Sequence, residues 1–314
     1  MKEIVYSVIA PACNEEEGIE EFYRRVKDVM DAAGEEYELV FVNDGSRDST
    51  IDKLLKIQSR DRRVVVLDFS RNFGHQIAVT AGIEHARGRA VVVIDADLQD
   101  PPEVIPQMIE MWKQGCEVVY GKRVKRKGES AFKRMTAFLF YRVLNVLSGQ
   151  KIPKDAGDFR LLDRKVCEAM KTLREHGRFL RGMVNWVGFR QAKVEYVRDP
   201  RFAGETKYTM KKMMRLAGDG IVGFSARPLK IALPAGLAVC FLALLYLIAM
   251  IILTCVLTPP PTYLHFVLAA ILGVLGLVLC ALGIMGIYMG RIFDEVQNRP
   301  LYILRGKYGG ENGG

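Results

Sequence analysis

The sequence predicts an α/β domain with a mostly parallel, doubly wound sheet, followed by a hairpin of two membrane-spanning helices. In the first half, short Val- and Ile-rich runs alternate with amphipathic segments, a pattern typical of parallel strands that helices cover on both faces. In the second half, residues 231–290 contain no Lys, Arg, Asp or Glu. These observations divide the chain into a charged α/β part and an apolar membrane part.

The elements of the α/β part follow from this alternation. Strands are expected at residues 3–10, 37–42, 63–69, 90–95 and 116–121, with a returning strand at 157–164. Helices are expected at residues 15–33, after Asp48, at 73–86, after Pro101–Pro102 and at 177–189. Asn14 followed by Glu17 is a capping pattern for the first helix. The carboxyl ends of parallel strands meet at one edge of the sheet, where such folds bind ligands.

The apolar part is long enough for two spans. Residues 231–257 would form a helix of roughly 40 Å, against a hydrocarbon core of about 30 Å. Thr258–Tyr263 is rich in proline and interrupts this run, and residues 264–290 form the second. The outer ends carry the basic residues Arg227, Lys230, Arg291 and Arg299. The positive-inside rule then places both termini in the cytoplasm, and the alternative, a buried hairpin of a soluble protein, is disfavoured.

The predicted organisation has five parts along the chain. They are a cytoplasmic domain at 1–206, amphipathic juxtamembrane helices at 207–230, the spans at 231–257 and 264–290, and a cytoplasmic tail at 291–314. Met and basic residues occupy different sides of the juxtamembrane segment, which is typical of helices that lie on an anionic lipid bilayer. Gly286 and Gly290 form a GxxxG pattern, which is compatible with packing of the hairpin or with a homo-oligomer.

Composition excludes several classes of site. The six cysteines include no CxxC pair, so neither a disulfide framework nor a zinc site is expected. The net charge of +9 is accompanied by no nucleic-acid-binding motif. Anionic lipid and phosphorylated ligands account for that charge, and no nucleic-acid partner is expected.

Carboxylates gather where the fourth strand ends, in "VVVIDADLQDPPE". Asp95 and Asp97 would start on one face, about 6.6 Å apart along an extended strand. Clustered negative charge calls for a cation. If the chain turns, Asp97 and Gln99 can ligate Mg²⁺ or Mn²⁺ together with ligand oxygens, while Asp95 holds a sugar or a coordinated water. A helix cap before Pro101–Pro102 explains Asp100, but not the other two aspartates.

Two further acids are candidates at the ends of earlier strands. Asp44, in "NDGS", can accept hydrogen bonds from a nucleobase N–H or a ribose hydroxyl, and the alternative is a turn residue. Glu15 is a candidate of the same kind, and its alternative is a first-turn acid that matches the helix dipole.

Six motifs together resemble one protein family. They are "IAPACNEEEG", "VNDGSRDST", "DFSRNFGHQ", "DADLQDPPE", "GDFRLLDR" and "GRIFDEVQNRPLY". With them the chain resembles the family 2 polyprenyl-phosphate glycosyltransferases of GT-A fold. That family includes bacterial undecaprenyl-phosphate glucosyl and aminoarabinosyl transferases and dolichyl-phosphate mannose synthase. The resemblance spans nearly the whole chain, and "DADLQDPPE" is its most specific motif.

The resemblance implies a nucleotide-sugar site. Pro11, Glu15 and Asp44 match positions that contact the nucleobase and ribose, and Asp95 and Asp97 match the DxD aspartates of the family. Cys13 departs from the aromatic residue of some relatives, which puts base selectivity in doubt.

The resemblance also implies phosphate and metal contacts. Arg123 matches an arginine near the diphosphate or the acceptor phosphate, and Arg201 and Lys207 match a basic pair that clamps phosphates. Asp97 and Gln99 match the metal-ligand positions, for Mg²⁺ or Mn²⁺. Thr206 stands where many relatives have Ser, and it retains the hydroxyl.

Asp158 matches an acidic residue at the reaction centre. It is expected to position the acceptor or the sugar, with a role as general base second. The alternative is an ion pair with Arg160 or Arg164.

The implied reaction is inverting transfer of a single sugar from a nucleotide-sugar donor to polyprenyl phosphate (undecaprenyl or dolichyl) at the cytoplasmic membrane face. UDP-glucose is the first expectation for the donor, followed by UDP-aminoarabinose and GDP-mannose. A processive polysaccharide synthase would need more spans and a QxxRW signature, which the sequence lacks. A non-catalytic sensor or scaffold predicts loss of the metal-binding residues, yet Asp95, Asp97 and Gln99 are present.

Overall fold

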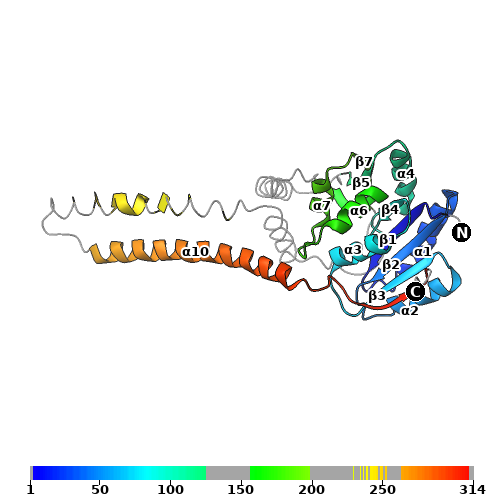
Figure 1. Cartoon of the computed structure of the whole chain (residues 1–314), viewed down its shortest axis with the longest axis horizontal. Coiled ribbons are helices and arrows are strands. Elements are labelled where there is room, and N and C mark those ends of the chain that lie inside the picture. The colour runs from blue at the N-terminus through cyan, green and yellow to red at the C-terminus, as the bar shows by residue number, and fades with distance from the viewer. Residues whose placement is uncertain are drawn as a thin grey trace.

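The computed structural model describes residues 3–124, 156–198 and 263–310, with scattered positions between 229 and 252. Within these residues a twisted sheet carries helices on both faces, and the long helix α10 (Tyr263–Gln297) projects away from it (Figure 1). The N-terminus and the C-terminal segment both lie on the α/β part.

The sheet has eight strands in the order β7-β5-β6-β4-β1-β2-β3-β8. The strands are β1 (Tyr6–Ala12), β2 (Tyr37–Asn43), β3 (Val64–Phe69), β4 (Ala90–Val93), β5 (Val118–Arg123), β6 (Ala156–Asp163), β7 (Gln191–Tyr196) and β8 (Leu304–Tyr308). The helices besides α10 are α1 (Ile19–Ala32), α2 (Thr50–Arg60), α3 (His75–His85), η1 (Pro102–Val104), α4 (Ile105–Lys113), α6 (Arg164–Thr172) and α7 (Leu180–Val187).

The predicted mostly parallel sheet is a mixed sheet. β1 pairs in parallel with β2 and β4, β2 with β3, and β5 with β7. β6 runs antiparallel to both of its neighbours, β4 and β5, and β8 runs antiparallel to β3. The strand expected at 157–164 is therefore confirmed, and it enters between two strands that follow each other in the sequence.

Two apolar layers hold the sheet. One face packs against α1, α2 and α4 through side chains such as Phe22, Leu54 and Met108. The other packs against α3, α6 and α7 through side chains such as Val79 and Met183. Because the strands are buried on both faces, their runs are continuously apolar rather than alternating.

The first helix begins later than predicted. α1 starts at Ile19, and Asn14 has a positive φ of 54°. The Asn14 side-chain oxygen accepts a hydrogen bond from the backbone N–H of Arg47 at 2.8 Å, so it joins two loops. The predicted cap at Asn14 is therefore wrong.

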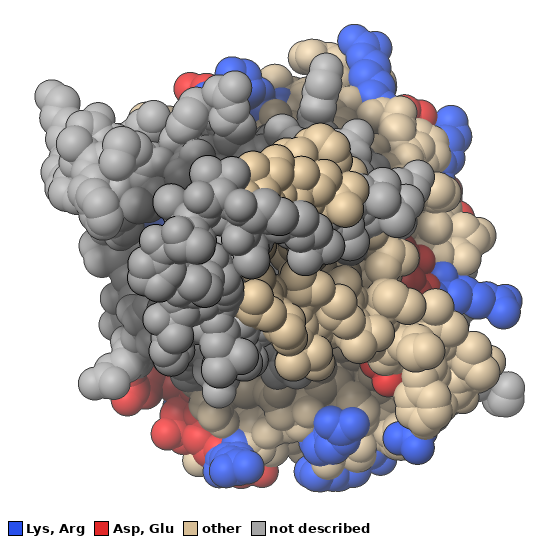
Figure 2. Space-filling view, turned by 90° about the vertical axis from the view of Figure 1, so that its left-hand side faces the viewer, with Lys and Arg blue, Asp and Glu red and all other residues tan. Residues whose placement is uncertain are grey.

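α10 contains the second predicted span. Its stretch Gly273–Gln297 is, in the described part of the chain, the one helix long and apolar enough to cross a membrane, by length and composition. Viewed from the side toward which α10 points, the charged side chains of the described residues lie around the periphery (Figure 2). Most of the first predicted span, 231–257, lies outside the described residues, so the two-helix hairpin is not confirmed.

The segment after α10 returns to the sheet. β8 pairs with β3 and forms one edge of the sheet, and Tyr302 stacks on Phe69 with ring centroids 5.0 Å apart. The Tyr302 hydroxyl donates a hydrogen bond to Glu84 Oε2 at 2.6 Å. This segment therefore covers β3 next to the loop that follows it, although no strand is predicted there from the sequence.

Candidate active site

The loop after β4 carries the predicted metal-binding motif. Asp95, Asp97 and Gln99 are partly exposed, whereas the residues between them are buried. Leu98 has a positive φ of 58°, and the backbone N–H of Gln99 donates to Asp97 Oδ1 at 3.2 Å. The chain therefore turns after β4, which is the condition under which Asp97 and Gln99 can act together. Positive φ at a non-glycine residue is uncommon and is often found at functional sites.

Asp158 lies beside this loop because β6 is the neighbour of β4. Their register pairs Val93 with Arg160, which places Asp158 just beyond the last residue of β4. Asp158 is 7% exposed, and both of its oxygens accept hydrogen bonds from Arg181 of α7, at 2.9 and 3.2 Å. Gln76 Nε2 donates to the same carboxylate at 3.3 Å.

The alternative partners predicted for Asp158 are only partly found. Arg160 Nη2 is 3.8 Å from Asp158 Oδ1, and it donates its hydrogen bond to the carbonyl of Gly157 at 2.9 Å. Arg164 pairs with Glu168 instead and donates to the carbonyl of Gly88, so an Arg164–Asp158 pair is wrong. Arg181, which the sequence analysis did not single out, is the close partner.

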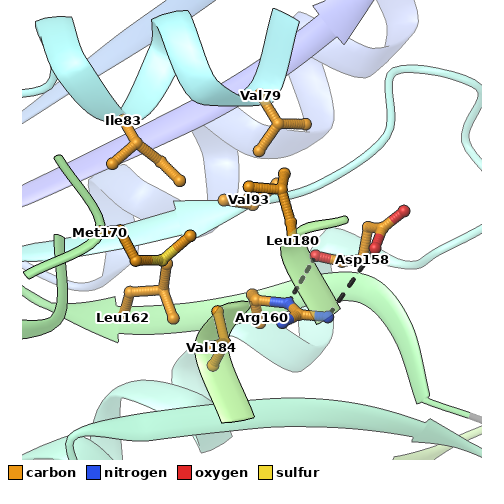
Figure 3. A pocket seen from close by; sticks show the side chains of 9 residues that line it. All are labelled: Val79, Ile83, Val93, Asp158, Arg160, Leu162, Met170, Leu180 and Val184. Atoms are coloured by element: carbon orange, nitrogen blue, oxygen red, sulfur yellow. Dashed lines mark hydrogen bonds and ion pairs between the residues drawn. The ribbon is translucent and has the colours of Figure 1, made fainter. Parts of the chain in front are cut away.

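A small apolar cavity lies beneath Asp158 (Figure 3). Asp158 and Arg160 stand at one end of it, and side chains from α3, β4, β6, α6 and α7 line the rest. The apolar lining residues are Val79, Ile83, Val93, Leu162, Met170, Leu180 and Val184. Because this layer is apolar, the negative charge of Asp158 must be compensated by the neighbouring cations Arg181, His75 and Arg160.

His75 lies between the two aspartates. It is the first residue of α3, and its Nε2 is 3.6 Å from Asp95 Oδ1 and 3.4 Å from Asp158 Oδ2. Burial disfavours the charged imidazole, but the two carboxylates outweigh burial and raise the pKa of His75 to about 9. A protonated His75 is thus expected at neutral pH.

The environments of the two aspartates differ. Burial raises the pKa of Asp95 to about 6, and the neighbouring carboxylates of Asp158 and Asp97 act in the same direction. Burial also favours the neutral form of Asp158, but Arg181 and His75 hold the pKa of this carboxyl well below its usual range. A carboxylate with a low pKa is a weak base, so this environment supports positioning over proton abstraction for Asp158.

Asp44 anchors the loop that leads to His75. Its carboxylate accepts hydrogen bonds from the backbone N–H of Phe73 at 2.7 Å, from Gly74 and from Asn72 Nδ2. Gly45 is required beside it, because a Cβ there would lie 2.5 Å from the backbone of Arg71. Burial raises the pKa of Asp44, against the backbone hydrogen bonds of residues 73 and 74. Its contact with a nucleoside stays a prediction.

The other predicted nucleoside contacts lie on adjacent strand ends. Pro11 is buried in β1 in register with Val42, and the Glu15 N–H donates to Thr50 Oγ1 at 2.9 Å. Cys13 Sγ accepts a hydrogen bond from Asn72 Nδ2 at 3.4 Å. These residues share the edge that carries Asp44.

Arg123 belongs to a buried network around Asp100. Arg123 Nη2 lies 3.4 Å from Asp100 Oδ2, and Arg198 Nε lies 3.3 Å from Asp100 Oδ1. The Tyr196 hydroxyl donates to Asp100 at 2.6 Å. Asp100 is fully buried and makes no cap hydrogen bond to η1, so the predicted cap role is wrong. Gly157 leaves space for Arg123, since a Cβ there would lie 2.8 Å from its guanidinium.

The residues present fit a divalent cation that a ligand helps to hold. Asp95 Oδ1 is buried and accepts no hydrogen bond within the described structure, although negative charge surrounds it. In the same part of the chain, no group of three or more His, Cys, Asp or Glu could hold a metal ion. Asp97 and Gln99 would therefore supply few ligands, and phosphate oxygens the rest, as is usual for Mg²⁺.

The remaining predicted residues, Arg201 and Lys207, lie outside the described residues. Sequence reasoning missed His75, Gln76 and Arg181. His75 and Gln76 stand where a strand end leads into a helix, at the same edge as the acids, and that position was the available signal for them.

The chain is similar to several known proteins. The pattern of glycosyl transferase family 2 matches residues 7–170. An uncharacterized glycosyltransferase of Bacillus subtilis (strain 168), YkcC, is 53% identical over 99% of this chain and 96% of its own. The SfII prophage-derived bactoprenol glucosyl transferase of Shigella flexneri is 43% identical over 97% of this chain and 98% of its own. Among solved structures, glucosyl-3-phosphoglycerate synthase from Mycobacterium tuberculosis has a TM-score of 0.47 and 18% identity, covering 70% of this chain and 78% of that one.

The family pattern runs from β1 into α6 and includes most of the described site residues. Arg181, Tyr196 and Arg198 lie after its end. The two relatives are similar over nearly their full length. This chain therefore belongs to glycosyl transferase family 2.

Proposed function

We propose that this protein transfers a single sugar from a nucleotide sugar to polyprenyl phosphate at the cytoplasmic face of a membrane. The observation that carries the proposal is the meeting of Asp95, His75 and Asp158 beside the turn that holds Asp97 and Gln99. A near-full-length relative named bactoprenol glucosyl transferase supports a polyprenyl acceptor and makes UDP-glucose the first donor to test. UDP-aminoarabinose and GDP-mannose are the next donors.

The proposed donor site follows the edge of the sheet. The nucleoside would lie near Pro11, Glu15 and Asp44, and the diphosphate near Asp97. Arg123, Arg201 and Lys207 would add positive charge to the leaving diphosphate. When bound at Asp97 and Gln99, Mg²⁺ or Mn²⁺ would supply further charge stabilisation.

The reaction needs no protein nucleophile. A polyprenyl monophosphate is already anionic near neutral pH, so its oxygen can attack the anomeric carbon of the sugar without a strong general base. The bond between the sugar and the diphosphate breaks as the new bond forms, which inverts the configuration. Asp158, held ionised by Arg181, would orient the sugar or the acceptor rather than remove a proton.

The long apolar helix suits an acceptor whose tail remains in the bilayer. We propose that α10 and residues 231–257 both span the membrane and that both chain ends are cytoplasmic. Residues 207–230 would then lie on anionic lipid, next to the acceptor phosphate. Self-association through Gly286 and Gly290 belongs to the same proposal.

The test is sugar transfer by the purified full-length protein in detergent. Labelled UDP-glucose, UDP-aminoarabinose and GDP-mannose are each offered with undecaprenyl or dolichyl phosphate, with Mg²⁺ or Mn²⁺ and then with EDTA. A lipid-linked product from one donor, lost with EDTA and in Asp97→Ala, supports the proposal. Asp28→Ala is the matched control, since Asp28 is an exposed helix residue paired only with Arg24 in the described structure. Donor binding without any lipid product would contradict transfer and favour a sensor.

A further inference from the structure

His75 contacts two carboxylates with a single ring nitrogen. Its Nε2 lies 3.6 Å from Asp95 Oδ1 and 3.4 Å from Asp158 Oδ2. One N–H cannot be donated fully to both oxygens, and 3.6 Å is long for a hydrogen bond. The position of this one N–H between the two carboxylates, rather than a short hydrogen bond to either, is therefore what links the pair. Asp95 follows β4 and Asp158 lies in β6, so His75 links the ends of two strands.

The two carboxylates depend on His75 to different extents. Asp158 also receives hydrogen bonds from Arg181 and Gln76. Asp95 Oδ1, in contrast, is buried and accepts no hydrogen bond in the described part of the chain. The imidazole lies against this atom, with Nε2 at 3.6 Å. Its removal would therefore release Asp95 first, while Arg181 still holds Asp158.

The backbone of His75 is fixed from the opposite side of the site. The preceding residue, Gly74, has a φ of 103°, and its N–H and that of Phe73 are held by the Asp44 carboxylate. A chain of contacts thus runs from Asp44 through the loop to His75 and on to both aspartates. The proposed nucleoside site and the proposed reaction centre are joined through this one side chain.

We propose that His75 is a positioning residue for sugar transfer, which fixes Asp95 relative to Asp158 so that donor and acceptor meet in a reactive orientation. The inference rests on the proposed function and adds a role to that same site. The alternative is that His75 only packs the start of α3. Misplacement of a group at a reaction centre lowers turnover even when substrate binding persists, and this distinguishes the two roles.

Two substitutions test whether the position of the His75 Nε2–H matters, or only the presence of a polar side chain at residue 75. In His75→Gln, the side-chain amide nitrogen reaches the position of Nε2, whereas in His75→Asn it reaches only that of Nδ1. His75→Asn is expected to lower kcat by about tenfold to a hundredfold, with the KM for the donor changed less than about threefold. His75→Gln is expected to recover most of this loss. His85→Asn, at the other end of α3, is the matched control and is expected to keep full turnover.

Two measurements independent of turnover accompany the assay. Calorimetric binding of the UDP-sugar is expected to be unchanged in both His75 variants. The thermal unfolding midpoint is expected to fall by a similar amount in both, because each lacks the imidazole that lies between the two carboxylates. Equal losses of kcat in the Asn and Gln variants, or no loss in either, would overturn the inference. The inference would also be overturned if the loss of turnover in each variant paralleled a lower unfolding midpoint and a loss of UDP-sugar binding, because these changes together indicate a packing role. If the wild-type protein makes no lipid product from any donor, the proposed function itself fails, and the inference fails with it.

Discussion

Arg181 donates two hydrogen bonds to the Asp158 carboxylate, from Nε at 2.9 Å and from Nη2 at 3.2 Å. The guanidinium comes from α7 and the carboxylate from β6, so the pair ties a helix to the strand that enters beside β4. Two parallel N–H···O bonds to one carboxylate are stronger and more directional than a lysine contact. This pair is the main reason why Asp158 stays ionised in a buried setting.

Arg181→Met should therefore impair the site more than Arg181→Lys. Loss of the guanidinium leaves a buried carboxylate held by His75 and Gln76, and kcat is expected to fall by about a hundredfold. Because Arg181 lowers the pKa of Asp158, its removal raises that pKa. As the pH is lowered, the Arg181→Met variant is therefore expected to lose activity at a higher pH than the wild type, because its Asp158 is protonated at a higher pH. The pH–rate profiles of the two variants and the wild type check this, and identical acid limbs would contradict it.

Asp100→Asn should weaken donor binding through Arg123. Asp100 is fully buried and its charge holds Arg123 and Arg198 in place, so the amide leaves the guanidinium of Arg123 less well oriented toward the proposed diphosphate. The KM for the donor is expected to rise several-fold, and the free energy of unfolding to fall by about 1–3 kcal/mol. Tyr196→Phe is the matched control. It removes the hydrogen bonds of the Tyr196 hydroxyl to Asp100 and from Arg123 Nε but keeps the charge of Asp100, so a smaller loss of stability and a smaller rise in KM are expected.

Much of the site could be predicted because it depends on local pattern. The position of Asp95, Asp97 and Gln99 at a strand end follows from a buried strand that runs into polar residues, and the structure places them in a turn after β4. The partner of Asp158 could not be predicted, because Arg181 is 23 residues away in the chain and the contact depends on how α7 packs. A nearby charge, Arg164, looked equivalent in the sequence and points elsewhere.

The fold shows the same division between local and distant effects. The central strands contain continuous apolar runs rich in Val, and such runs can be predicted as buried strands from the sequence alone. β8 contains Arg305, Gly306 and Lys307, so its composition does not indicate a strand. It forms because the segment after α10 lies next to β3 and pairs with it. The false cap at Asn14 has a related cause, since its side chain binds the distant Arg47 N–H instead of its own helix.

Gly45→Ala should destabilise the protein more than a similar change at another glycine with positive φ. Gly45 has a φ of 62°, and a Cβ there would lie 2.5 Å from backbone atoms of Arg71 and Asn72. Gly34 has a φ of 75°, but a Cβ there meets nothing within 4 Å. Gly34→Ala is expected to cost about 1–2 kcal/mol, from the left-handed backbone alone. Gly45→Ala adds a steric clash and displaces the loop that Asp44 holds. Thermal unfolding of both variants checks this, and equal midpoints would contradict it.

The last prediction concerns the contact between His176 and the end of α10. The His176 N–H donates to Glu295 Oε1 at 2.7 Å, Nδ1 lies 2.9 Å from Glu295 Oε2, and Nε2 lies 2.7 Å from the Arg299 carbonyl. Both ring nitrogens face acceptors, so the doubly protonated imidazole fits this site. The hydrogen bond to Glu295 is the largest cause that raises the pKa of His176, with the Arg299 carbonyl second.

The sign of the pH dependence follows from this direction. A histidine whose pKa is higher in the folded protein stabilises it fully below its unfolded pKa, about 6.5, and this stabilisation is lost as the pH rises through the folded value. The difference in unfolding midpoint between wild type and His176→Gln should therefore be larger at pH 6 than at pH 9. His85→Gln is the matched control with the opposite sign, because burial lowers the pKa of His85, and Lys307 adds to this. A wild type and a His176→Gln variant with the same pH slope would show that the imidazolium does not hold α10 against the α/β domain.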